Sequence, residues 1–303
     1  MNLIALLIGL AVERLATQLF HLRELRWLDK VIDAGYGQFA RFAGWPAIIP
    51  VALLAALLVF PVFLVTFLLG DALFGFAYLL LAVIVLFFSL GPRDIGEEID
   101  DYCSALESGD AERIRVTSKA LLERDVDDDE AERIRHVEEA VFVQANNRLF
   151  AVIFWFVVFG PLGAWAYRVM DLIRRRAVFN ASRADGSADE AERMAAAAAA
   201  LHGWVAWIPA RLTAAGYALA GSFDDARAAW RHPHAPEALT TGEQNEQLLG
   251  RVGAAAIALG HRDNESVTER GIRGATAARH LVLRLLWLWA VVIAGLTLYG
   301  WSM

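Results

Sequence analysis

Long uncharged apolar runs alternate along this chain with segments that are dense in charge. Residues 47–69 and 72–90 contain no charged side chain, and each is long enough to cross a bilayer as a helix of about 20 residues. Gly70-Asp71 separates the two runs and is typical of a turn. The pattern therefore predicts a membrane helical hairpin with a very short outer loop, in which Pro50 and Pro61 are tolerated by local rearrangement.

A third apolar run, residues 149–167, is interrupted by Gly160-Pro161-Leu162-Gly163. A full crossing would place Arg174, Arg175 and Arg176 on the opposite side from other basic residues, against the excess of Lys and Arg expected in cytoplasmic loops. Those other residues are Arg93, Arg113 and Arg148. We therefore expect a re-entrant element, built from two half-helices that dip into the membrane and return to the cytoplasmic side.

Both ends of the chain are also apolar. Residues 3–20 are interrupted on one side by Glu13, Arg14, Thr17 and Gln18, which indicates an interfacial or membrane helix with a polar stripe. Residues 285–303 are uncharged and follow four arginines, so they are expected to form a last span that enters from the cytoplasm. These arginines are Arg270, Arg273, Arg279 and Arg284.

The charged stretch 97–143 holds a near repeat, with DAERIR at 110–115 and EAERIR at 130–135. Acidic residues in a first helical turn are favourable, so the repeat predicts two helices with solvated faces. Residues 191–201 are rich in alanine and predict another helix. Pro209 is expected to break the apolar stretch 202–220, and residues 221–273 predict loops with short helices.

The predicted fold class is all-α: a multi-pass integral membrane protein with three to five membrane segments, one of them re-entrant, and cytoplasmic helical loops. Residues 1–92 are expected to form an N-terminal membrane helix and the hairpin, and residues 93–143 a cytoplasmic helical segment. Residues 144–221 should supply broken, partly embedded helices around a site, and residues 222–303 a cytoplasmic loop and the last span.

Composition and motifs limit the classes of function that this chain can have. The chain is 57% hydrophobic with a net charge of −7, so lipid is an expected partner and nucleic acid is not. The single cysteine, Cys103, cannot form an intrachain disulfide, and the N-terminus lacks the basic region of a secretory signal. Phosphate-binding loops, hydrolase elbows and zinc-protease motifs are absent from the sequence. His232-Pro233-His234 lacks a third ligand at metal-binding spacing, so no metal site is predicted.

The candidate site consists of polar side chains placed on or beside apolar segments. Arginines among amides suit a small anionic ligand that carries a phosphate or carboxylate, whereas each residue alone could also snorkel to lipid or cap a helix. The pocket hypothesis predicts that Arg148, Arg168 and Arg211 converge, and it leaves catalysis open. The full candidate set is Glu13, Arg14, Asn146, Asn147, Arg148, Tyr167, Arg168, Asp171, Trp207 and Arg211.

Three sequence strings resemble the AmpE family. They are FVQANNR at 142–148, the FWFxxxGPxGAxxYR pattern at 154–168, and WIPARLT at 207–213 with Gly216, Tyr217 and Gly221. The resemblance runs from Glu13-Arg14-Leu15 to the last span. It implies a signalling modulator of the bacterial inner membrane, with loops mainly cytoplasmic, linked to AmpD, to β-lactamase regulation and to sensing of cell-wall turnover.

The same segments are more distantly similar to the CobD/CbiB membrane synthases of cobalamin biosynthesis. That resemblance implies, as the alternative, an ATP-dependent ligase using a nucleotide with Mg. Where those enzymes carry a Glu-Asn pair and a following Asp, this chain has Val143, Gln144 and Asn147. Without these acids the obvious groups for metal or proton chemistry are missing, so we expect binding rather than catalysis. A transporter is a third hypothesis, which a homodimer would favour because the spans of one chain are few.

Overall fold

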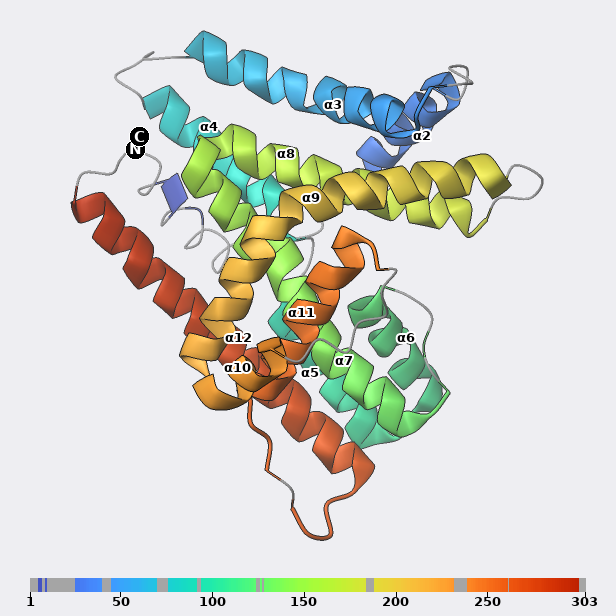
Figure 1. The fold of residues 1–303 in the computed structure, drawn as a ribbon. Coiled ribbons are helices and arrows are strands. Elements are labelled where there is room, and N and C mark those ends of the chain that lie inside the picture. Colours follow the sequence, from blue (N-terminus) through green and yellow to red (C-terminus); the bar gives the residue numbers. More distant parts are fainter. Residues whose placement is uncertain are drawn as a thin grey trace.

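The computed structural model of the 303-residue chain describes residues 5, 6, 9, 25–39, 45–69, 76–91, 94–123, 126, 128–183, 188–231, 239–260 and 262–299. All regular structure in these ranges is helical, which confirms the predicted all-α class (Figure 1). Glu13 and Arg14, the Gly70-Asp71 turn and the His232–His234 stretch lie outside the described residues.

Three stretches within the described residues are long and apolar enough to cross a membrane: Ile48–Leu69, Glu130–Ala181 and Val267–Gly295. The chain is thus a multi-pass membrane protein, as predicted. Figure 1 places the end of α3 (Ile48–Leu69), the start of α4 (Phe76–Ser89) and the end of α12 (Val267–Leu298) on one side of the molecule. Exposed apolar side chains cover these parts, as expected of a lipid-facing surface: Leu57, Phe60, Phe63, Phe67, Leu68, Phe76, Leu80, Trp287 and Val291.

α8 (Ala151–Ala181) reverses direction at Gly160, whose backbone angles are φ 63° and ψ −151°. The Tyr167 hydroxyl lies 3.3 Å from Asn147 Oδ1, 20 residues earlier in the chain. In one straight helix these residues would be separated by about 30 Å, so the two halves must run back toward the same end. The predicted half-helix reversal is confirmed, and it returns Arg174 to the neighbourhood of Arg148.

Gly160 occupies a backbone region that is essentially restricted to glycine. We expect Gly160→Ala to destabilise the protein by about 1–3 kcal/mol, because a Cβ atom would strain the reversal. Thermal unfolding of the detergent-solubilised protein measures the effect. Gly295→Ala is the control, since a Cβ atom there meets nothing within 4 Å. Equal melting temperatures for the two variants would contradict the strained reversal.

The expected helix break at Pro209 is wrong. α9 (Ala188–Ala220) continues through the proline as one helix. Proline has no N–H to donate to the carbonyl four residues earlier, which belongs to Val205. Trp155 Nε1 of α8 donates to that carbonyl at 3.1 Å. The side chain of a neighbouring helix therefore supplies the hydrogen bond that Pro209 cannot make.

The charged repeat begins two helices, as predicted. Asp110 and Asp129 accept backbone N–H bonds at the N-termini of α6 (Ala111–Leu122) and α7 (Glu130–Ala145). α5 (Ile95–Ser108) and α6 pack beside α7 in the lower right of Figure 1. α2 (Arg26–Phe39) lies near the end of α8, where Asp33 forms an ion pair with Arg176.

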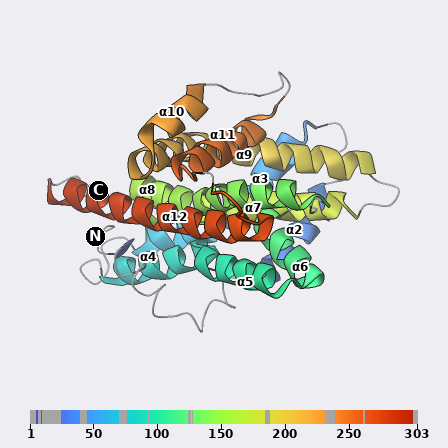
Figure 2. The ribbon, with the colours of Figure 1, turned by 90° about the horizontal axis from the view of Figure 1, so that it is seen from below.

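Helix packing differs from the expected hairpin in two respects. α3 and α4 both pack on α8, and far less on one another. α12 begins at Val267, before the four arginines, so the helix is longer than the apolar run alone predicted. The stretch 221–273 contains α10 (Phe223–Arg231) and α11 (Thr241–Ala256), and α11 packs closely against α9. In Figure 2, α12 runs across the view between α9–α11 on one side and α4 and α5 on the other.

Candidate functional site

A π-helical turn, η3 (Asn146–Phe150), joins α7 to α8 at the centre of the molecule. π-turns inside helices often occur at functional sites. Here the turn accommodates buried polar side chains between apolar neighbours. Thr213 Oγ1 donates to Asn146 Oδ1 at 2.9 Å, and Asn146 Nδ2 donates to Asn147 Oδ1 at 3.1 Å.

Asn147 is the last member of this hydrogen-bond chain. Its Oδ1 accepts from both Asn146 and Tyr167. Two accepted bonds fix the amide orientation and leave the Nδ2 group as a donor. Asn147 thus keeps a hydrogen-bond donor at the junction of α7 and α8.

Arg148 joins three helical segments through buried bonds. Its Nη1 donates to Glu98 of α5 at 2.7 Å, its Nη2 to Glu123 at 2.9 Å, and its Nε to Gln144 at 3.0 Å. Arg175 also pairs with Glu123. Burial opposes ionisation of Glu123, but Arg175 and Arg148 outweigh it and hold the pKa of that carboxyl below its usual range.

Asp171 is fully buried and binds three arginines of its own helix. Arg168 Nη1 lies 3.0 Å and Arg175 Nε 2.9 Å from Asp171 Oδ2, and Arg174 Nη2 lies 3.1 Å from Oδ1. The spacing of three and four residues puts all these side chains on one helix face. A single carboxylate thereby fixes the side chains at the returning end of α8.

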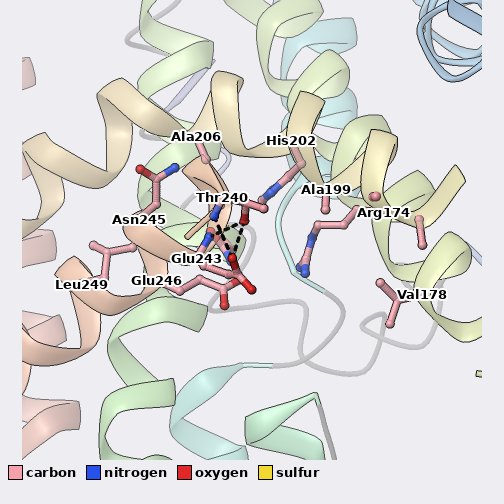
Figure 3. Close-up of a pocket in the computed structure, with 14 residues that line it drawn as sticks. Arg174, Val178, Ala199, His202, Ala206, Thr240, Glu243, Asn245, Glu246 and Leu249 are labelled. Atoms are coloured by element: carbon pink, nitrogen blue, oxygen red, sulfur yellow. Dashed lines mark hydrogen bonds between the residues drawn. The ribbon is translucent and has the colours of Figure 1, made fainter. Parts of the chain in front are cut away.

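Two adjoining cavities open beside this network. The first, of about 320 Å³, lies between α8, α9 and α11 and is lined by Asn147, Arg174, His202 and Asn245, among others. The second, of about 370 Å³, lies between α7 and α11. The two share Asn147, Arg174, Glu243 and Glu246. Figure 3 shows Arg174 and His202 on one side of the first cavity, facing Glu243 and Glu246.

His202 lines the first cavity but has little contact with solvent, and its Nε2 lies 3.9 Å from Asp171 Oδ1. The residue is 4% exposed, and its Nε2 makes no hydrogen bond within the described residues. Burial, with a further contribution from Arg174, lowers the pKa of His202 to about 3, although Asp171 acts in the opposite direction. The imidazole is therefore neutral at physiological pH.

This histidine predicts a pH dependence of stability. Below the ordinary histidine pKa of about 6.5, the imidazole is protonated in the unfolded chain but stays neutral in the folded protein. The free energy of unfolding therefore falls as the pH drops from about 6.5 toward 3. The loss should reach about 2 kcal/mol at pH 5. Asp171, Arg174, Arg175, Tyr167 and Glu123 surround the imidazole.

We expect His202→Gln to lessen the difference between melting temperatures measured at pH 7.5 and pH 5. Unfolding of the solubilised protein at both pH values measures it. An unchanged difference in the variant would show that His202 does not carry this dependence.

The structure gathers only some of the predicted site residues. Asn146, Asn147 and Tyr167 form one hydrogen-bond chain, and Asn147 lines both cavities. Arg148 and Arg168 are held by separate carboxylates and line neither cavity.

Arg211 has its own partners on α9 and α11. It stacks over the Trp207 ring at 4.0 Å and donates to Asn245 at 2.8 Å. Arg148, Arg168 and Arg211 thus have different partners, and their convergence on one ligand stays a prediction.

Sequence reasoning missed most of the cavity lining. In the sequence, Arg174 indicates only charge bias, and no motif marks His202 or Asn245 as site residues. Glu243 belongs to a capping box with Thr240, a signal readable as Thr-x-x-Glu at the start of α11. That signal predicts a helix but not its position beside α9.

Together, the lipid-facing helices, the reversing α8 and the polar cavity define a multi-pass α-helical membrane protein with a buried ion network next to a small-molecule-sized cavity. The chain belongs to the AmpE family: the profile described as "Regulatory signalling modulator protein AmpE" matches residues 1–302. Family membership supports a membrane signalling role, and the similarity to CobD proteins described next supports a CobD-like one.

The chain is also similar to curated proteins named "Cobalamin biosynthesis protein CobD". The protein of Stutzerimonas stutzeri is 30% identical over 219 residues, which cover 69% of this chain and 68% of the relative. The protein of Chromobacterium violaceum is 27% identical over 228 residues, which cover 71% of this chain and 70% of the relative. No solved structure matches the chain.

Proposed function

We propose that this protein is an inner-membrane signalling modulator that binds a small ligand bearing a phosphate or carboxylate in the cavity between α8, α9 and α11. The observation that carries the proposal is the buried imidazole of His202, which lines a polar cavity and whose Nε2 makes no hydrogen bond among the described residues, with Asp171 Oδ1 3.9 Å away. Buried polar atoms nearly always have partners, so an unpartnered one beside a cavity favours a ligand.

The donors around the first cavity support an acid group as the part that binds. Asn147 presents its Nδ2 group, and the Arg174 guanidinium is oriented by Asp171 at 3.1 Å. Guanidinium and amide donors match carboxylate and phosphate oxygens. The volume of about 320 Å³ falls at the lower end of small-molecule pockets.

Charge distribution supports a cytoplasmic position for the cavity. The reversal of α8 puts Arg148 and Arg174–Arg176 at the same end of the molecule, and α12 starts with four more arginines. Basic residues concentrate on the cytoplasmic side of membrane proteins. In this position the ligand would come from the cytoplasm, consistent with sensing of cell-wall turnover products, regulation of β-lactamase and a link to AmpD.

Filling the cavity tests the proposal without disturbing the ion network. Ala199 lines the first cavity, so Ala199→Phe should occupy it, whereas Ala215→Phe adds the same ring on the exposed face of α9. Each gene is introduced into a deletion strain, and β-lactamase induction is measured. The wild-type gene changes the induction back to its normal level. We expect the Ala199→Phe gene to fail to do so and the Ala215→Phe gene to succeed. Membrane levels of both variants are measured by immunoblot. Full function of Ala199→Phe at normal membrane levels would refute the cavity as the site.

A second candidate function, a CobD-type ligase, is favoured by the similarity to two proteins of cobalamin biosynthesis. Incubation of the purified protein with adenosylcobyric acid, an amino alcohol, a nucleotide and Mg tests it. The amide product would establish the ligase, and absence of both product and substrate binding would dismiss it.

A further inference from the structure

We infer that residues 204–219, the second half of α9, lie along the membrane–water boundary with their outer face against lipid. Within the described residues, α9 is not one of the stretches long and apolar enough to cross a bilayer. The contact therefore runs along the membrane surface, as it does for an interfacial amphipathic helix. It uses the face of α9 that points away from the cavity, so it is independent of the proposed ligand.

The two faces of this segment carry the reverse of the pattern expected in water. The inner face packs on α8, α11 and α12 and consists mainly of small buried residues. These include Gly203, Ala206, Ala210, Thr213, Ala214 and Gly216. The large apolar side chains lie on the outer face and are between 45% and 66% exposed: Trp204, Trp207, Ile208, Leu212 and Leu219. An exposed apolar surface of this kind marks a site of contact with protein or membrane.

The exposed side chains form one continuous stripe. At about 100° per residue, they lie within about 140° of the helix circumference. Ala215 falls inside the same arc and is also exposed. A stripe of this width is the face that an amphipathic helix normally buries. No described helix covers it, so its partner is outside the chain.

The stripe borders lipid-facing residues of α8. Trp155 Nε1 donates to the Val205 carbonyl at 3.1 Å, which fixes α9 beside the first half of α8. That half ends with three exposed apolar residues, at 157–159. It belongs to a stretch that is able to cross the membrane.

α12 adjoins the other end of the segment. Gly216 approaches Leu285 so closely that a Cβ atom on the glycine would collide with the leucine side chain. Trp287 and Val291 of α12 are exposed just beyond this contact. This part of α12 also belongs to a candidate span. The stripe is therefore continuous with the lipid-facing surface on two sides, and this favours lipid over a protein partner.

The direction of the segment fits a position in the plane of the membrane. Figure 1 shows α9 bending: its first half runs beside α8 and α3, and its second half turns away toward α10. The second half thus crosses the direction of α3, which is a candidate span. A helix that crosses the direction of a span lies along the membrane rather than through it.

Arg211 places the stripe at the boundary and not in the hydrocarbon centre. It lies in the middle of the stripe, where a guanidinium is costly unless it reaches the headgroups. The side chain stacks on Trp207 at 4.0 Å, and tryptophan is enriched at membrane–water interfaces. Both hydrogen bonds of Arg211 to described residues use Nη1, so Nη2 can donate to a lipid phosphate.

Nitroxide labels measure the depth of this face. Cys103, the one cysteine of the chain, is replaced by serine, and Ala215→Cys supplies a labelling position in the stripe. Leu57→Cys, in the middle of α3, is the lipid reference, and Glu112→Cys, on α6, is the water reference; both positions are exposed. The full-length protein is studied in nanodiscs of phosphatidylcholine and phosphatidylglycerol.

Collision rates with oxygen and with nickel(II) ethylenediaminediacetate distinguish the environments. We expect the ratio of oxygen to nickel collisions at position 215 to be several-fold higher than at position 112 and lower than at position 57. A ratio equal to that at position 112 would place the face in water and overturn the inference. A ratio equal to that at position 57 would overturn the boundary position. Low collision rates with both reagents would indicate a second copy of the chain on this face and overturn the lipid contact.

A variant of Arg211 tests its part in setting the depth. In Arg211→Leu the charge that holds the stripe at the headgroups is gone, so the ratio at position 215 should rise toward that at position 57. Arg113→Leu, on the exposed face of α6, is the matched control and should leave the ratio unchanged. An unchanged ratio in Arg211→Leu would overturn the anchoring role of Arg211.

Discussion

Replacing Asp171 with alanine is expected to prevent recovery of folded protein. Asp171 is fully buried, and it binds Arg168, Arg174 and Arg175. Removing one partner of a buried ion pair typically costs about 3–5 kcal/mol, because the remaining charge stays desolvated. Here one change affects three guanidinium groups, and the whole stability of a domain is only about 5–15 kcal/mol.

Size-exclusion profiles and thermal unfolding of the solubilised protein measure this effect. Asp171→Asn preserves the side-chain volume but not the charge, so we expect it to fail nearly as completely. Asp101→Ala, at an exposed position of α5, should behave as the wild type. A monodisperse Asp171→Asn protein with wild-type melting temperature would show that the carboxylate charge is not what holds the arginines.

Replacing Arg148 with alanine is expected to cost about 3–5 kcal/mol of stability. The side chain is 5% exposed and connects Glu98, Glu123 and Gln144. Glu123 keeps its pair with Arg175, whereas the buried Glu98 carboxylate loses its 2.7 Å contact. The loss should therefore separate α5 from the centre of the molecule.

Arg148→Lys separates charge from geometry in the same experiment. Lysine keeps the positive charge but lacks the planar fork that binds several acceptors at once, so it should recover less than half of the lost stability. Arg113→Ala, on the exposed face of α6, is the matched control. If the lysine variant melts like the wild type, the planar fork that reaches three separate acceptors has no energetic importance.

The reversal of α8 could be predicted from the sequence because two independent signals agreed. Gly160-Pro161 interrupts the apolar run, and the charges of Arg148 and Arg174 require the same side of the membrane. Helix starts at Asp110 and Asp129 were also predictable, since capping is a local interaction. Pro209 misled the prediction because its consequence depends on Trp155, which is close in space but distant in sequence.

The site was less predictable from the sequence because its side chains also have partners that are distant in the chain. Amides and arginines at 146–148 and 168 are recognisable in the sequence as unusual in an apolar context. Which carboxylate neutralises each arginine depends on helix packing: Glu98 lies 50 residues from Arg148 in the chain, and their atoms are 2.7 Å apart. The role of α11 as a cavity wall likewise arises from its packing on α9, which no local pattern in residues 241–256 encodes.

The central claim is that the cavity beside Arg174 and His202 holds a small molecule. A density map of the protein, purified in a mild detergent from its own membrane, tests it most directly. The claim predicts density for a compact polar molecule between Arg174, His202 and Glu246. A well-resolved cavity that contains only water, in protein that supports β-lactamase regulation in cells, would contradict it.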